Sequence, residues 1–268
     1  MQNIANAKKI NFKAGESANE GIITIEPLFP GYGMTLGNSI RRVLLSSLPG
    51  AAVVGAKIKG ASHEFMALPH IKEDVLEIIL NLKQLRLKVF TDEEVRLEIK
   101  VKGKKVVKAS DITKNSQVEI KNSDLVLANI TDEAGSLDIE LIVCEGRGYR
   151  MAEGNKKENR EIGYIEIDST FSPVTLVSID VENARVGKMT NWDKLVLKIK
   201  TDATITPEEA FKESVNILVD QFSALINLEE GEKKEEVVEL EEVKEDIVEE
   251  VSEEPEPKKE KKAKKIKK

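Results

Sequence analysis

Two hydrophobic periods alternate along the first 228 residues, one typical of strands and the other of helices. Apolar residues at every second position, or in short apolar runs between turn residues, predict strands over 22–28, 84–90, 95–102, 137–143, 162–168, 176–181 and 195–201. Spacings of three and four predict a helix over 71–82, on Ile71, Val75, Ile78, Ile79 and Leu82. The pattern therefore indicates a mostly β body with few helices.

A second predicted helix follows the glycine-rich stretch 31–37 and ends before Pro49-Gly50. At about 100° per residue, one side has the composition of a core-facing stripe: Leu36, Ile40, Val43, Leu44 and Ser47. The opposite side is mixed: Asn38, Arg41, Arg42 and Leu45. An apolar residue between arginines and an asparagine is typical of a contact surface for another macromolecule. An ordinary solvated arginine pair is the alternative.

A third helix is predicted from a capping box, in which Thr206 is the N-cap, Pro207 the first helical residue and Glu209 the third. Its apolar positions step by four and three: Phe211, Val215, Leu218, Phe222 and Leu225. Five further apolar residues widen this stripe: Ala210, Ile217, Val219, Ile226 and Leu228. A stripe this broad indicates that the helix meets both its own sheet and a second surface, for which self-association is the simplest source. The alternative is that the whole stripe covers one side of its own sheet.

Composition narrows the class of protein. The 268 residues are 40% hydrophobic, which permits one or two domains. A single cysteine, Cys144, excludes internal disulfides, and with only His63 and His70 beside it the chain alone cannot assemble a zinc site of the common kinds. The chain has no apolar run near 20 residues and no secretory signal at its start, so we expect a cytoplasmic protein without membrane contact.

The formal net charge of -7 conceals a segregated tail, rich in glutamate from 229 to 254 and in lysine from 258 to 268. So many charges without aromatic residues predict disorder over 229–268. The acidic half could form an amphipathic helix on a partner, and the lysine end could bind nucleic acid weakly and without sequence preference. A solubilising tail with no fixed partner is the alternative.

Catalytic motifs are scarce. Gly31-Tyr32-Gly33 and Gly146-Arg147-Gly148 do not continue into a phosphate loop or a dinucleotide fingerprint, and no serine lies in a Gly-x-Ser-x-Gly elbow. The sequence therefore predicts no catalytic residue, no metal site and no cofactor, and it favours an interaction module. An enzyme that cradles phosphate in the 31–37 loop is the rival interpretation.

Several blocks of sequence resemble one known family in that family's order. They are Ile25-Glu26-Pro27-Leu28, residues 31–50, His63-Glu64-Phe65, residues 73–83, Gly146-Arg147-Gly148-Tyr149, Phe171-Ser172-Pro173-Val174, residues 181–186 and Asp193-Lys194-Leu195. Together they span nearly all of 20–228, and they resemble the bacterial RNA polymerase alpha subunit.

The resemblance implies an α+β fold in which a discontinuous α/β dimerisation domain, 1–49 and 171–228, holds an inserted mostly β domain, 50–170, and is followed by the disordered charged tail. It implies a homodimeric platform on which the β and β′ catalytic subunits assemble for DNA-templated transcription. The chain would then be a non-catalytic subunit of a nucleotidyltransferase, with omega and sigma in the complete enzyme.

The resemblance also implies roles for particular residues. The dimer interface would contain Leu36, Val43, Phe211, Val215, Leu218, Phe222 and Leu225. The β contact would centre on Arg42, with Asn38, Arg41 and Leu45 beside it. The β′ contact would contain Phe171, Ser172, Pro173, Val174, Asn191, Asp193 and Lys194. The two copies of the dimer would make different contacts, because two different partners break its symmetry.

The chain departs from the family after Leu228, where most members continue into a small helical DNA-binding domain that is not visible here. We therefore expect DNA to be contacted through the complex, and only weakly by the lysine tail.

Overall fold

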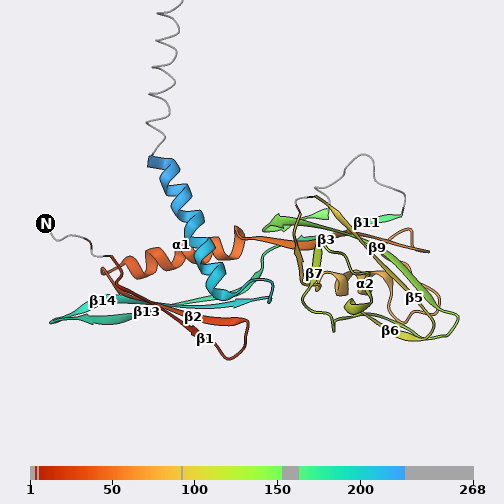
Figure 1. Ribbon diagram of the computed structural model, residues 1–268, viewed down its shortest axis with the longest axis horizontal. Coiled ribbons are helices and arrows are strands. Elements are labelled where there is room, and N and C mark those ends of the chain that lie inside the picture. The colour runs from red at the N-terminus through yellow and green to blue at the C-terminus, as the bar shows by residue number, and fades with distance from the viewer. Residues whose placement is uncertain (1–3, 5, 92, 153–162, 227–268) are drawn as a thin grey trace, which may run out of the picture. The chain divides into compact units, whose positions relative to one another are not determined.

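The computed structural model describes residues 4, 6–91, 93–152 and 163–226, which contain helices and a larger number of strands (Figure 1). The chain divides into two compact units, Met1–Leu218 and Val219–Lys268. The tail 229–268, predicted to be disordered, lies outside the described residues. Within the described part of the chain, no helix is long and apolar enough to span a membrane.

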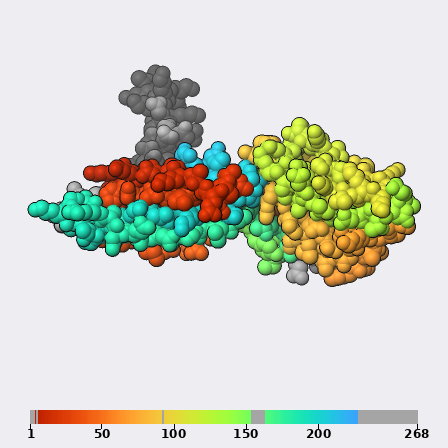
Figure 2. All heavy atoms as spheres, turned by 90° about the horizontal axis from the view of Figure 1, so that it is seen from below, coloured from red at the N-terminus to blue at the C-terminus, as the bar shows by residue number. Residues whose placement is uncertain are grey.

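The first sheet joins strands from both ends of the first unit. It contains β1 (Lys9–Ala14), β2 (Glu20–Leu28), β14 (Met189–Thr201) and β13 (Val174–Val186), in that order and all antiparallel. These strands lie side by side in Figure 2, where β1 and β2 are red and β13 and β14 teal. Along β14 the residues Leu195, Leu197 and Ile199 are buried whereas Lys198 and Lys200 are exposed, so the sheet has one core face and one polar face.

Helix α1 (Tyr32–Ser46) packs on the core face of this sheet (Figure 1). Its buried residues are Gly33, Gly37, Ile40 and Leu44. The prediction that this helix follows the glycine-rich stretch 31–37 was wrong, because α1 begins at Tyr32. Glycine is unfavourable inside a helix, so Gly33 and Gly37 indicate a loop when the sequence is considered alone. They are needed here since a Cβ on Gly37 would lie 3.0 Å from both Ile179 and Leu195. Of the predicted core-facing stripe, Ile40 and Leu44 are buried, whereas Leu36 is 38% exposed.

The predicted capping box at Thr206 is confirmed. The Thr206 hydroxyl accepts from the Glu209 N–H at 3.3 Å, and the Glu209 carboxylate accepts from the Thr206 N–H at 3.2 Å. Residues 207–218 are helical in the first unit, and residues 219–226 are helical in the second. Phe211 is 6% exposed and meets the ring of Phe12 edge-on at 5.9 Å, so the start of this helix belongs to the core of its own chain.

The second sheet holds the residues between α1 and β13. Its order is β5 (Val95–Lys102), β9 (Ser136–Arg147), β3 (Pro49–Ile58), β4 (Leu87–Val89) and β7 (Val118–Ile120), with β11 (Tyr164–Glu166) also on β3. Two small ribbons pair β6 (Lys105–Lys108) with β8 (Val126–Ile130) and β10 (Tyr149–Arg150) with β12 (Ser169–Thr170). Helix α2 (Val75–Leu82) and the single turn η1 (Ala109–Asp111) complete this region.

Most predicted strands are confirmed, and the errors have physical causes. Only 87–89 of the predicted strand 84–90 is extended, because Gln84 and Leu85 close the last turn of α2 with bonds to Asn81 and Leu82. Helix α2 begins at Val75 rather than 71, where the Asp74 carboxylate caps the Glu77 N–H at 2.7 Å. Strand β3 was missed because it is buried on both faces and shows no alternation.

Buried apolar residues gather around these two sheets in separate clusters. The larger cluster draws on residues 53–167. Another draws on residues 23–48 and 174–211, so two distant stretches of chain share one core. The predicted α+β class is confirmed, since strands predominate and the helices pack on their faces.

Candidate docking surfaces

One flank of the exposed surface of α1 carries a mixed patch. Its members are all exposed: Met34, Asn38, Arg41, Arg42 and Leu45. Among the described residues neither arginine has a carboxylate partner. Guanidinium groups beside exposed apolar side chains are what an interface with another protein typically uses. We name this set the arginine patch. The sequence analysis did not include Met34 in it, although Met34 precedes Arg41 by seven residues and Leu45 by eleven and therefore lies on the same flank of the helix.

The opposite flank of α1 is apolar. Leu36 and Val43 lie two turns apart there, with Leu36 exposed and Val43 half-buried. One helix thus offers two different flanks at once, because its buried face is occupied by the sheet and lies between them.

The N-terminus of α1 is bound by a carboxylate from β14. Asp193 Oδ2 accepts hydrogen bonds from the N–H groups of Gly31 at 2.9 Å and Gly33 at 3.0 Å. These amides are the ones that a phosphate would need, and a negative charge already lies on them. The interpretation of 31–37 as a phosphate-cradling loop is therefore contradicted: residues 32–37 are helical and their glycines serve packing.

The described part of the second unit, residues 219–226, is one helical stretch with large exposed apolar side chains. They are Val219, Phe222, Leu225 and Ile226, between 55% and 76% exposed. Soluble proteins seldom leave four such side chains uncovered in two turns unless they contact another surface. Of the residues predicted at the dimer interface, Val215 and Leu218 are half-buried, and Phe211 is the one that offers almost no surface.

The residues predicted for β′ divide into buried and accessible ones. Phe171, Pro173 and Val174 are buried in their own chain, and the Arg150 guanidinium lies 5.2 Å from the centre of the Phe171 ring. Their burial leaves little surface for another subunit, and their place in a β′ contact stays a prediction. Ser172 is half-buried and donates to the Val174 carbonyl at 3.2 Å.

The accessible members lie at the start of β14. Asn191 is exposed, whereas Lys194 donates to the Glu182 carboxylate at 2.8 Å. That hydrogen bond raises the pKa of Lys194 and lowers the pKa of Glu182. Because the pair is solvated, its contribution to stability is small, and the ammonium remains available to a partner.

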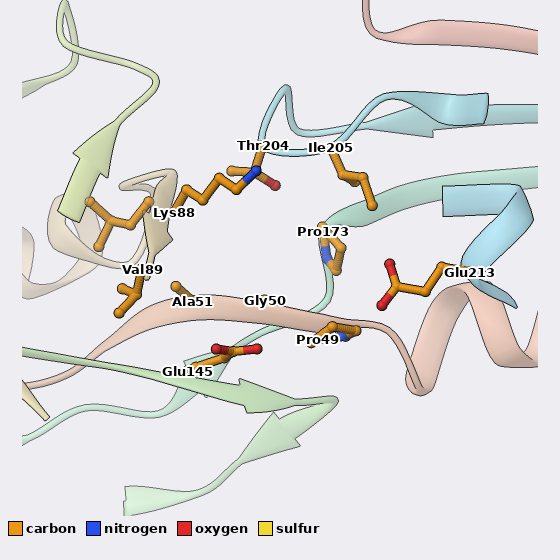
Figure 3. A pocket seen from close by; sticks show the side chains of 11 residues that line it. Pro49, Gly50, Ala51, Lys88, Val89, Glu145, Pro173, Thr204, Ile205 and Glu213 are labelled. Carbon is orange, nitrogen blue, oxygen red and sulfur yellow. The ribbon is translucent and has the colours of Figure 1, made fainter. Parts of the chain in front are cut away.

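A hollow of about 200 Å³ lies beside Pro49 and Pro173, and Figure 3 shows Lys88, Glu145 and Glu213 as the charged side chains around it. Its one hydroxyl, on Thr204, donates to Asp202 within a turn. No histidine or cysteine lines it, so nucleophile and base are not brought together there. Over the described residues, no cluster of three or more histidine, cysteine or acidic side chains could hold a metal ion.

Comparison with known proteins identifies the family. Residues 56–172 match the family described as the RNA polymerase Rpb3/RpoA insert domain. The chain is 52% identical over 210 residues to the DNA-directed RNA polymerase subunit alpha of Carboxydothermus hydrogenoformans, covering 78% of this chain and 67% of that protein. It is 46% identical over 243 residues to the subunit of the same name from Oceanobacillus iheyensis, covering 90% and 77%.

The chain belongs to the bacterial RNA polymerase alpha-subunit family. Its function is accordingly that of an alpha subunit of DNA-directed RNA polymerase, in transcription. The surfaces above are therefore surfaces of a protein that works inside a nucleotidyltransferase complex.

Proposed function

We propose that this alpha subunit forms a homodimer, that the dimer is the platform on which the β and β′ subunits assemble, and that the chain supplies no catalytic group. The observation that carries the proposal is the pair of unlike flanks on α1: one is apolar, and the other bears guanidinium groups that have no carboxylate partner among the described residues.

The dimer contact uses the apolar side chains. Leu36 and Val43 of α1, and Val215 and Leu218 of the helical residues 207–218, are the apolar side chains that the first unit offers to a second copy of the chain. The second unit offers Phe222 and Leu225. The portion of each large side chain that is still exposed is worth about 1–2 kcal/mol on burial. Phe211 is buried in the core of its own chain, so its part in the contact is to pack under its neighbours in the first unit.

The β contact uses the arginine patch. Arg41 and Arg42 have no carboxylate partner in the described chain, so carboxylate or carbonyl oxygens of another subunit can accept from both without breaking an existing ion pair. Leu45 and Met34 add apolar area between the charges.

The β′ contact is reduced to the accessible residues of the prediction, Asn191, Lys194 and Ser172. A twofold dimer presents each surface twice, whereas β and β′ are different chains, so one copy engages β and the other β′.

The two cores support a domain division as part of the proposal. Residues 1–49 and 171–228 form the dimerisation domain and 50–170 the inserted domain, since one core joins stretches on both sides of the other. We also propose a cytoplasmic location, with omega and sigma present in the complete enzyme.

The test is the mass of each assembly formed by the full chain. Light scattering coupled to size exclusion should give twice the chain mass for the subunit alone. Added β should bind one per dimer, and β′ should bind only to the dimer that already carries β or with lower affinity without it. A monomer, or one β per chain, contradicts the proposal.

A further inference from the structure

Helix α1 begins without a cap of its own. Its N-cap residue is Gly31, which has no side chain, and the first turn, residues 32–35, contains no acidic residue. The first N–H groups of a helix have no partner within the helix, so they need acceptors from elsewhere. In most helices the residue at the N-cap supplies one.

The acceptor for α1 comes from a distant strand. Asp193 Oδ2 lies 2.9 Å from the Gly31 nitrogen and 3.0 Å from the Gly33 nitrogen, across 162 and 160 residues of sequence. Both partners are glycines for reasons of geometry. Gly31 has φ of 88°, and a Cβ on Gly33 would lie 3.0 Å from the same carboxylate oxygen.

Aromatic side chains surround the same corner. The ring of Phe29 meets that of Trp192 at 5.9 Å and that of Tyr32 at 6.1 Å, both edge-on. Trp192 precedes Asp193 on β14, and Tyr32 is the first residue of α1. Carboxylate and rings thus join the helix start to the β13–β14 hairpin.

We infer that Asp193 is a positioning residue: its carboxylate oxygen fixes the first turn of α1 on the hairpin and so holds Met34 and the rest of the arginine patch in the orientation that docks on β. The last part rests on the proposed function. Asp193 thereby acts through α1, rather than as the direct β′ contact that the sequence suggested.

Asparagine and alanine at this position separate the two roles. An asparagine oxygen can accept the same two hydrogen bonds, and asparagine is as good a cap as aspartate, whereas alanine cannot accept any. A direct ion pair with another subunit would instead be lost equally in both variants. The matched control is Asp180→Ala. It removes an exposed carboxylate from the neighbouring strand β13, where Asp180 Oδ2 lies 3.6 Å from Lys198 Nζ.

The full-length chain is used with two readouts that need no partner. In Asp193→Ala we expect hydrogen exchange at the Gly31 and Gly33 amides to be about fivefold to tenfold faster. Emission of Trp192, the one tryptophan of the chain, should move to longer wavelength as the corner loosens. Asp193→Asn and Asp180→Ala should stay close to the unsubstituted chain in both.

Binding of β provides the third readout. Asp193→Ala should weaken it by about twofold to fivefold, because a smaller fraction of chains holds α1 ready, and Asp193→Asn should restore it. Unchanged exchange in the alanine variant, or equal losses of binding in both variants, overturns the positioning role. Arg42→Ala, measured in the same experiment, distinguishes failure of the proposed β contact from failure of the positioning role. Undiminished β binding by Arg42→Ala refutes the docking surface, whereas hydrogen exchange in Asp193→Ala still decides whether Asp193 holds α1.

Discussion

The N–H of Gly33 donates to Asp193 Oδ2 at 3.0 Å, joining the first turn of α1 to a strand 160 residues away. The same two residues leave no room for a larger side chain. A Cβ on Gly33 would lie 2.9 Å from Val181 and 3.0 Å from the Asp193 oxygen. A residue that normally weakens a helix is therefore what lets this helix reach its sheet.

Gly33→Ala should destabilise the protein, against the usual sign. Alanine inside a helix is ordinarily better than glycine by about 1 kcal/mol. Here the added methyl group must push Val181 and Asp193 aside, and we expect a net loss of about 1–3 kcal/mol in the free energy of unfolding, measured with urea.

The control for that substitution is Gly31→Asn. Gly31 has φ of 88° and nothing within 4 Å of a Cβ, and asparagine tolerates this backbone region better than most residues, so its effect should be smaller. A Gly33→Ala protein more stable than the unsubstituted chain would show that α1 does not press on the hairpin as described.

Local sequence patterns were sufficient to predict those helices and strands whose conformation depends on residues within the same element. Residues 95–102 alternate, and the capping box at Thr206 satisfies its own backbone, so both predictions are confirmed. Local patterns failed to predict features that depend on tertiary contacts. The helical glycines, the two-sided burial of β3 and the burial of Phe171 depend on partners far away in sequence.

The same limit applies to the docking surfaces. Exposure of Arg41, Arg42 and Leu45 follows from helical spacing and was predicted. The hydrogen bond between Asp193 and the first turn of α1 was not predicted, because no local pattern links residue 193 to residue 33.

Acid should weaken the part of the chain around β6 and η1 through Asp111. The Asp111 carboxylate accepts hydrogen bonds from the Lys105 ammonium at 2.6 Å and from the Lys108 N–H at 3.0 Å. These bonds hold the pKa of Asp111 below its ordinary value of 3.8. A carboxyl whose pKa is lowered by folding stabilises the fold above its unfolded pKa and loses that effect as the pH falls through the folded pKa.

Asp111→Asn should therefore be less stable than the unsubstituted chain at neutral pH, with the difference shrinking as the pH falls below 3.8. Urea unfolding at a series of pH values measures it. Lys105→Met should reproduce part of the loss at neutral pH, and a difference that is constant with pH would argue against this role for the carboxylate.

Phe222→Glu should convert the dimer to a monomer, because a carboxylate in an apolar contact costs several kcal/mol. Light scattering reports the mass. Gln221→Glu adds the same charge one position earlier in the described helix and should leave the dimer intact. If both variants stay dimeric, residues 219–226 are not the dimer contact.

The most direct test of the platform is recovery of β by the full chain carrying Arg42→Ala. Arg42 is exposed and has no carboxylate partner among the described residues, so its loss should not disturb the dimer by light scattering. Recovery of β should fall about tenfold or more, since truncation leaves a buried acceptor unpaired in the partner. Lys198→Ala, which removes a cation from the polar face of the sheet, should leave recovery unchanged. Full recovery of β with Arg42→Ala would contradict the account.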